Sequence, residues 1–431
     1  MRVRAQFLRN AFGSKMNLLY CHDNVYFHSE TGEVYSQGQF PSSYFQVFLE
    51  HFDNLTVLGR GVPLNRNLDI SKLNLSSDNH IEFELMPNIN SIKGLASNYF
   101  KVNKEVERLV ENADAVVIRA VSDLGWLTYK HAKRLGKPIA MEMAACAWDS
   151  TWNHGSLQGR LYAPVRYIRD KIITQNSDFV IYVSQSFLQA RYPTNGHTAV
   201  ASNVRIDKPP SEILDKRIAK INQQDQDTIL TIGLIGTLSH KLKGVQTALE
   251  ALKGIESKTP GRFIFKVLGP GKADQYRKIA NDLGIGHCVF FEGVIRSGDA
   301  VLNWLDNVDI YIQPSYQEGV PRATIEAMSR GCTCAGSTAG GIPELLPPEW
   351  LHKPGDTEKL QDILSELIDN KSARLKAADL NFEKASFYTS DKLRPIRSNF
   401  WKEFKSFTQN RINKKPIPAP STHMAPAHKD G

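Results

Sequence analysis

Residues 228–253 read TILTIGLIGTLSHKLKGVQTALEALK, which is a short apolar run, a glycine-containing loop and an amphipathic segment in succession. Apolar residues fill most positions of 228–235, as is typical of a strand buried on both faces of a parallel sheet. After the loop, apolar side chains recur at helical spacing, at Val245, Ala248, Leu249 and Leu252. The succession of strand, loop and helix predicts one unit of a doubly wound α/β domain.

The same alternation continues on both sides of this unit. Buried strands are expected at residues 114–120, 139–143, 178–183, 263–268, 288–291, 309–313 and 332–335. Helical patterns separate them, for example at 124–135. The polar stretch NQQDQD at 222–227 divides the two series, so we expect the interdomain linker between Asn203 and this stretch. The predicted fold class is therefore α/β, with one domain at 1–203 and a second at 204–384.

Length and composition favour a globular protein of this kind. With 431 residues, the chain exceeds what one hydrophobic core usually holds, and 41% hydrophobic and 23% charged residues are a globular balance. No run of about 18 apolar residues occurs, which argues against a transmembrane helix. Residues 1–5 lack the features of a signal peptide, so we expect a cytoplasmic protein. Five scattered cysteines are expected to be free thiols in a reducing compartment, namely Cys21, Cys146, Cys288, Cys332 and Cys334.

The C-terminal region divides into a helical segment and a tail. The segment 392–407 carries aromatic residues at helical spacing, namely Phe400, Trp401, Phe404 and Phe407. Such a helix should dock its aromatic face on another part of the protein. Residues 411–431 contain repeated prolines and almost no large apolar side chains, so we expect them to be disordered.

The sequence with the most chemical information is EGVPRATIE at 318–326. It follows a predicted strand that ends near Gln313, and its Gly and Pro suit a tight turn before a helix. Ligands in open α/β sheets bind at such turns, where free backbone N–H groups can hold phosphate. Glu318 and Glu326 bracket these donors and suit the hydroxyl groups of a sugar and a ribose. Acids that only complement the dipole at a helix N-terminus would give a similar pattern. The complete sequence 318–326, in its place between a predicted strand and a predicted helix, favours a ligand site.

In residues 318–326, two glutamates are separated by seven residues that include Gly-x-Pro. This pattern resembles a motif of the retaining glycosyltransferases of family 4. Residues 235–244 resemble the phosphate-binding loop of that family, and GSTAGGIPEL at 336–345 resembles its Gly-rich Pro-Glu segment. Residues 117–149 and 178–193 resemble a bacterial polysaccharide-related subgroup. The resemblance implies the GT-B fold, in which two Rossmann-like domains face each other and a C-terminal helix, here near 385–410, crosses back to the first domain.

The resemblance also implies roles for residues of the C-terminal domain. Glu318 matches the acid that contacts the transferred sugar near the reaction centre, and Glu326 matches the acid that binds the nucleotide ribose. Lys243 matches the lysine on the donor diphosphate; a loop lysine is usually solvated, but its place before Gly244 and a helix favours donor binding. Thr237 stands where the family often has Arg, so one positive charge is missing and a hydroxyl takes its place. The other donor-binding residues implied in this way are Gly236, Gly319, Val320 and Pro321.

The N-terminal domain offers fewer matches. Many family members place a His near the reaction centre, and the strand end that should carry it reads EMAACAWD at 142–149. Asp149 is the candidate catalytic residue there, with a helix cap as the alternative role. His154, in a polar loop, is a second candidate. Gly38 and Gln39 lie where the family has a loop near donor phosphate and acceptor, although a plain turn would look the same.

The resemblance implies transfer of a sugar from a UDP- or GDP-sugar to a hydroxyl of a glycan or lipid-linked acceptor. It also implies retention of anomeric configuration, with neither metal nor cofactor. Asp225 and Asp227 form D-x-D, a metal-binding pattern in another glycosyltransferase fold, but they precede a strand instead of following one, so we expect a solvated linker. A phosphorylase or epimerase of the same fold is an alternative, as is a catalytically degenerate binding subunit. The intact Glu318 and Glu326 disfavour the degenerate subunit.

The net charge of +8 indicates an anionic partner, and the sequence contains no nucleic-acid-binding motif. Basic residues gather in three places, namely Arg2, Arg4, Arg9 and Lys15, then Arg160, Arg166, Arg169 and Lys171, and finally residues 392–415. Each basic residue near an anionic bilayer can add about 1 kcal/mol of attraction. We therefore expect peripheral association with the inner face of the cytoplasmic membrane. Solubility or binding of an acceptor phosphate would account for the same charges.

Overall fold

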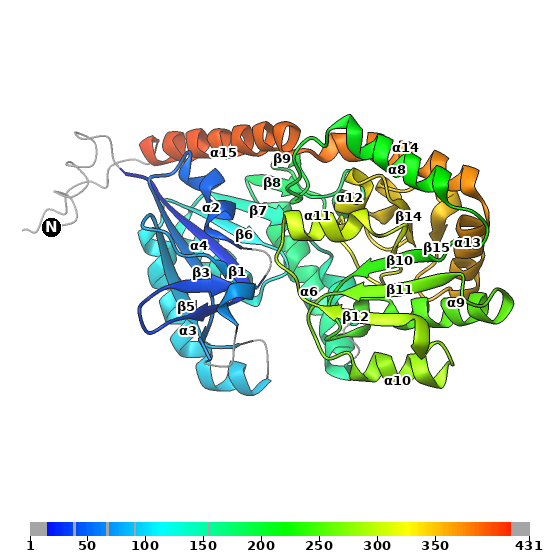
Figure 1. Ribbon diagram of the computed structural model, residues 1–431. Coiled ribbons are helices and arrows are strands. Elements are labelled where there is room, and N and C mark those ends of the chain that lie inside the picture. The colour runs from blue at the N-terminus through cyan, green and yellow to red at the C-terminus, as the bar shows by residue number, and fades with distance from the viewer. Residues whose placement is uncertain (1–14, 38–39, 66–68, 90–91, 154–155, 415–431) are drawn as a thin grey trace, which may run out of the picture.

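The computed structural model describes residues 15–37, 40–65, 69–89, 92–153 and 156–414. Two lobes lie side by side in Figure 1, and each is built around its own sheet. A long C-terminal helix runs along the top of the N-terminal lobe (Figure 1). The two α/β domains and the crossing helix are those that the sequence predicted.

The N-terminal domain is built on a sheet to which nine strands of the described residues contribute. Strand β1 pairs in parallel with β3 and β6, and two short antiparallel strands, β2 and β4, extend the sheet. The strands are β1 (Asn17–His28), β2 (Val34–Ser36), β3 (Asn54–Pro63), β4 (Asn74–Leu75), β5 (Ile81–Met86), β6 (Ala115–Arg119), β7 (Ile139–Met143), β8 (Phe179–Tyr182) and β9 (His197–Val200). The helices are α2 (Ser42–Leu49), α3 (Ile92–Asn112), α4 (Asp123–Leu135), α5 (Ala147–Trp152), α6 (Leu157–Asn176) and α7 (Phe187–Arg191).

The C-terminal domain has a fully parallel sheet with the order β12-β11-β10-β13-β14-β15. Its strands are β10 (Leu230–Ile235), β11 (Phe263–Leu268), β12 (Val289–Gly293), β13 (Ile310–Gln313), β14 (Thr333–Ser337) and β15 (Leu351–His352). Its helices are α8 (Ser211–Gln223), α9 (Val245–Lys258), α10 (Asp274–Asp282), α11 (Asp299–Asp306), α12 (Arg322–Ser329), α13 (Thr357–Asp369) and α14 (Lys371–Ala385).

In both domains the central strands are formed by stretches of consecutive apolar residues. Every residue of β6 and of β7 is buried, because helices cover both faces of a parallel sheet. Each strand predicted from such a run is confirmed, with ends within two residues of the prediction. Helix α4 is confirmed as well: the Ser122 side chain accepts a hydrogen bond from the N–H of Gly125, and Gly136 ends the helix at a φ of 61°.

Two parts of the chain differ from the sequence-based expectation. The first is the predicted linker between Asn203 and the polar stretch 222–227, which contains the unpredicted helix α8. Its Arg217 is buried and donates to the carbonyl oxygens of Leu305 and Val308, so tertiary contacts hold this helix in place. The second is the region before residue 114, where β1 to β5, five of the nine strands described in this sheet, were not predicted.

Helix α15 (Ser390–Asn413) is the predicted crossing helix, but it begins later than residue 385 and includes residues 411–413, which were expected to belong to a disordered tail. Phe400, Trp401 and Phe404 are buried, as their helical spacing predicted. Trp401 packs on Phe48 of α2, with the ring centroids 4.7 Å apart, and Phe404 packs on Phe179 of β8. The C-terminal segment of the chain therefore completes the core of the N-terminal domain.

Helix α6 carries a buried carboxyl group that should make the protein less stable as the pH rises. Burial raises the pKa of Asp170 to about 8, against the opposing charge of Arg166. The folded protein thus keeps a proton that the unfolded chain releases above about pH 4. Between these two pKa values the free energy of unfolding should fall by up to about 1.4 kcal/mol per pH unit.

We expect Asp170→Asn to raise the free energy of unfolding at pH 8 and to have little effect at pH 4. Urea denaturation at both pH values measures this difference. Asp178→Asn, which changes a partly exposed acid paired with Arg411, is the control and should not stabilise the protein at pH 8. Equal stability of Asp170→Asn and wild type at pH 8 would contradict the assigned pKa.

Candidate active site

Glu318 lies in the loop that follows β13, at the carboxyl edge of the C-terminal sheet, and is 7% exposed. Its Oε1 accepts three hydrogen bonds, from Gln313 Nε2 at 2.9 Å, Ser315 Oγ at 2.7 Å and Lys243 Nζ at 2.6 Å. The carboxylate is therefore held in a single orientation by groups from two strand-to-helix loops. Such an arrangement presents a fixed negative charge to a ligand at the edge of the sheet.

Lys243 belongs to the loop between β10 and α9, which the sequence predicted to bind phosphate. Its side chain crosses over Gly236, where an added Cβ would lie 2.7 Å from Lys243 Cγ. The next residue, Gly244, has a φ of 71°, and a Cβ there would lie 1.9 Å from the carbonyl oxygen of Pro314. Both glycines are thus required for the lysine to reach Glu318.

The hydroxyl of Thr237 joins its own loop to the loop that follows β11. Its hydroxyl donates to the carbonyl oxygen of Pro270 at 3.3 Å and accepts from the N–H of Ser239 at 3.2 Å. The loop therefore has an ordered hydroxyl at the position where the family resemblance implied an arginine.

Glu326 lies on α12, one helical turn after Arg322. Burial raises the pKa of Glu326, and the positive charge of Arg322 opposes this effect. The turn that precedes the helix contains Gly319, Val320 and Pro321. A Cβ at Gly319 would lie 2.2 Å from the carbonyl oxygen of Ala144, so the two domains are in close contact at this turn.

Glu344 joins the two domains, a role that the sequence did not indicate. Its carboxylate accepts hydrogen bonds from the backbone N–H groups of Gln185 at 2.6 Å, Ser186 at 3.0 Å and Phe187 at 3.0 Å. These groups lie at the start of α7 in the N-terminal domain. The Pro-Glu segment predicted from its family resemblance thus contacts the opposite domain.

Asp149 lies on α5 and forms an ion pair with Arg191. Both carboxylate oxygens lie 2.9 Å from Arg191 Nη1. Together with Trp148 and Tyr167, this ion pair lines a hollow in the N-terminal domain. The other N-terminal candidates, Gly38, Gln39 and His154, lie outside the described residues.

A buried charge network lies at the carboxyl edge of the N-terminal sheet, and sequence reasoning missed it. Glu142, at 2% exposure, accepts hydrogen bonds from Arg119 at 3.0 Å, Arg397 at 3.0 Å and the hydroxyl of Tyr44 at 2.5 Å. Burial alone would raise the pKa of Glu142, but the two arginines and these hydrogen bonds lower it to about 2. The network joins β6, β7, α2 and α15.

Several of the basic residues are neutralised within the protein. Arg166 and Arg169 both pair with Asp123. Three arginines of α15 pair with acids of the N-terminal domain, namely Arg394 with Glu50, Arg397 with Glu142 and Arg411 with Asp178. Arg2, Arg4, Arg9 and Lys415 lie outside the described residues. Within the described ranges, no helix combines the length and apolar character needed to cross a bilayer.

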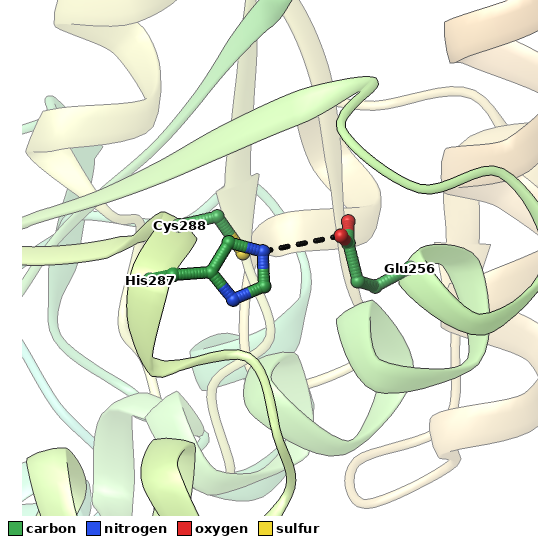
Figure 2. Close-up of side chains that lie close together, drawn as sticks. All are labelled: Glu256, His287 and Cys288. Carbon is green, nitrogen blue, oxygen red and sulfur yellow. Dashed lines mark hydrogen bonds and ion pairs between the residues drawn. The ribbon is translucent and has the colours of Figure 1, made fainter.

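One group of described side chains has the composition and spacing to hold a metal ion. The donor atoms of Glu256, His287 and Cys288 lie within 4.8 Å of one another (Figure 2). His287 Nε2 is 3.2 Å from Glu256 Oε1, and Cys288 Sγ donates to the carbonyl oxygen of Ile285. Burial and the charge of Glu256 raise the pKa of Cys288 to about 11, so its thiol is protonated at neutral pH. The group lies at the amino end of β12, away from the edge that carries Glu318.

All five cysteines are buried and free, as expected. Asp225 also behaves as predicted: its carboxylate accepts hydrogen bonds from the N–H of Asp227 and the hydroxyl of Thr228 in a turn before β10. The D-x-D pattern is therefore part of a local turn.

Comparison with known proteins matches the C-terminal domain to one family. Residues 229–370 match the model for glycosyl transferases group 1. The match supports a group 1 glycosyltransferase. Protein CapJ from Staphylococcus aureus is 28% identical over 395 residues, which are 90% of this chain and 96% of CapJ. The amylovoran biosynthesis glycosyltransferase AmsK from Erwinia amylovora is 32% identical over 166 residues, covering 36% of this chain and 40% of AmsK.

Solved structures extend the fold similarity to both domains. Sucrose-phosphate synthase from Thermosynechococcus elongatus superposes with a TM-score of 0.63 at 16% identity and covers 92% of this chain and 99% of its own. Anabaena HepE in complex with UDP gives a TM-score of 0.59 at 17% identity, covering 92% of this chain and 100% of its own. The GT-B fold predicted from the sequence is thus confirmed, and the sequence comparisons support glycosyltransferase activity.

Proposed function

We propose that this protein transfers a sugar from a nucleotide-sugar donor to a hydroxyl group of a glycan or lipid-linked acceptor. The observation that carries the proposal is the contact between Lys243 and Glu318 at the edge of the C-terminal sheet. It joins a cation suited to a diphosphate with a carboxylate suited to a sugar, on two loops of a domain that matches group 1 glycosyltransferases. The HepE structures in complex with UDP and with UDP-glucose favour a UDP-sugar as donor.

The proposed chemistry needs positioning and electrostatics more than a covalent nucleophile. Cleavage of the bond between sugar and diphosphate leaves positive charge on the sugar and negative charge on the leaving group. Glu318 stabilises the first, and Lys243 with the backbone N–H groups of its loop stabilises the second. Glu326 binds the nucleotide ribose. We further propose retention of anomeric configuration, on the family resemblance of residues 318–326.

The acceptor is proposed to belong to the assembly of a bacterial polysaccharide. AmsK is a biosynthetic enzyme for amylovoran, and WcaL of Escherichia coli, 28% identical over 148 residues, carries the name of a colanic acid biosynthesis glycosyltransferase. A binding subunit without activity is the second candidate. The Thr237 hydroxyl, which hydrogen-bonds to Pro270 and Ser239 where an arginine would contact the diphosphate, favours that candidate.

Incubation of the purified protein with a panel of UDP- and GDP-sugars tests the proposal. We expect slow release of nucleotide from one donor, together with an upward melting shift of the protein by that donor. Nuclear magnetic resonance of the released or transferred sugar reports whether the anomeric configuration is retained. A melting shift without turnover in the presence of a glycan acceptor pool would support the binding subunit instead.

Turnover should survive removal of divalent ions, because Lys243 and backbone donors are proposed to neutralise the diphosphate. We expect EDTA to change the rate by less than about twofold, since no step is assigned to a metal Lewis acid. The rate is measured with and without EDTA, and after addition of manganese. Loss of activity in EDTA with recovery in manganese would overturn the metal-independent mechanism.

A further inference from the structure

Helix α6 carries four exposed aliphatic side chains. The exposed fractions are 74% for Leu157, 72% for Leu161, 40% for Val165 and 54% for Ile168. At about 100° per residue, these positions fall within one quarter of the helix circumference. They form a continuous stripe that faces solvent, which we call the α6 stripe.

The orientation of the α6 stripe is set by contacts on the other side of the helix. Ala163 and Ile173 are buried in the N-terminal domain, and Arg166 and Arg169 are tied to Asp123 on α4. The helix therefore cannot roll to bury its leucines without breaking these contacts. Single exposed apolar residues are ordinary on protein surfaces, but a contiguous apolar patch marks an interaction site.

The charges of α6 indicate which partner the stripe fits. Arg160 and Lys171 are exposed and lie on one flank of the stripe. None of the ion pairs among the described residues involves either of them. The one acid of α6, Asp170, is 2% exposed and faces the protein interior. An apolar stripe flanked by cations, with no exposed acid, is the pattern of a helix that lies in the surface of an anionic bilayer.

The position of α6 relates this surface to the candidate active site. In Figure 1, α6 lies between the two lobes. Helix α5 packs against it, and Asn153, at the end of α5, donates a hydrogen bond to the carbonyl oxygen of Tyr316 at 3.1 Å. Tyr316 is two residues before Glu318. A bilayer against the α6 stripe would therefore lie close to the contact between the domains that precedes Glu318.

We propose that the α6 stripe docks the protein on an anionic membrane surface, with its aliphatic side chains among the acyl chains and with Arg160 and Lys171 at the headgroups. This assignment replaces the larger basic clusters of the sequence-based expectation, because several of their arginines are occupied by internal ion pairs. The docking itself does not depend on the proposed sugar transfer. Only the further consequence, that a lipid-linked acceptor would be delivered close to the candidate active site, rests on the proposed function.

Cosedimentation with vesicles of phosphatidylglycerol and phosphatidylcholine tests the docking. We expect the full-length protein to bind these vesicles, and the double variant Leu157→Gln/Leu161→Gln to lose at least about tenfold in partition coefficient. The matched control is Ile229→Gln/Leu380→Gln, which changes two exposed aliphatic residues of the C-terminal domain and should bind like wild type. Arg160→Gln/Lys171→Gln should weaken binding and flatten its dependence on salt.

Three results would overturn the proposal. They are absence of binding to anionic vesicles, equal binding by the leucine variant and wild type, and a change of oligomeric state in the leucine variant on light scattering. The last would make the stripe an interface between copies of the chain. Nucleotide release from the donor sugar should be unchanged in the leucine variant, because these residues lie outside the donor site. Failure of vesicle binding is thereby distinguished from failure of the proposed sugar transfer.

Discussion

Replacement of Glu318 by Gln is expected to lower turnover by at least about a hundredfold while donor affinity stays within a few-fold of wild type. A hundredfold loss corresponds to about 2.7 kcal/mol of transition-state stabilisation. The substitution should preserve the loop, because an amide oxygen can still accept the hydrogen bonds from Gln313 and Ser315. What disappears is the negative charge, which matters most when positive charge develops on the sugar.

Glu326→Gln supplies the contrast for this experiment. Its expected effect is a loss of about 1–3 kcal/mol in nucleotide binding, the cost of charged hydrogen bonds to a ribose, with a smaller effect on turnover at saturating donor. Calorimetric titration with the nucleotide and steady-state kinetics separate the two variants. Wild-type turnover in Glu318→Gln would refute the role given to this residue, and so would a loss confined to donor affinity.

Glu142→Gln should produce the largest loss of stability. Its carboxylate contacts both Arg119 and Arg397, whose side chains are 7% and 13% exposed. Removing the acid leaves two buried guanidinium groups without a counter-charge, at an expected cost of about 3–5 kcal/mol in the free energy of unfolding. Urea denaturation followed by circular dichroism at pH 7 measures this cost.

Glu50→Gln is the matched control, because it breaks an exposed ion pair between the same two parts of the protein. Glu50 pairs with Arg394 of α15, whose side chain is 74% exposed, and the expected cost is below about 1 kcal/mol. A similar loss in both variants would contradict the role assigned to burial.

The effect of Glu142 on stability should also depend on pH. Its pKa of about 2 in the folded protein lies below the unfolded value near 4.3, so its stabilising contribution is present above that value and is lost as the pH falls towards 2. The difference between wild type and Glu142→Gln should therefore shrink in acid. A difference that stayed constant from pH 7 to pH 3 would show that the carboxylate charge is not what stabilises the network.

Local sequence was sufficient where the physical signal is itself local. Buried parallel strands need apolar residues at consecutive positions, so β6, β7 and β11 could be located from 114–120, 139–143 and 263–268. The three-residue strand β2 and the half-exposed β5 have no such run, and they were missed. Helix α8 was missed for a related reason, because the contacts of Arg217 with residues 305 and 308 stabilise a segment that reads as polar.

For the candidate site, the sequence determined which residues follow the strands of the C-terminal sheet. Glu318 and Lys243 occupy loops after β13 and β10, and the carboxyl ends of neighbouring parallel strands must meet at one edge. Only the tertiary structure decided which distant charges pair. Glu142 and Arg397 are 255 positions apart, and Glu344 reaches backbone groups of the other domain across 157–159 positions. No local sequence pattern indicates such pairs, because they depend on how the two domains and the crossing helix pack together.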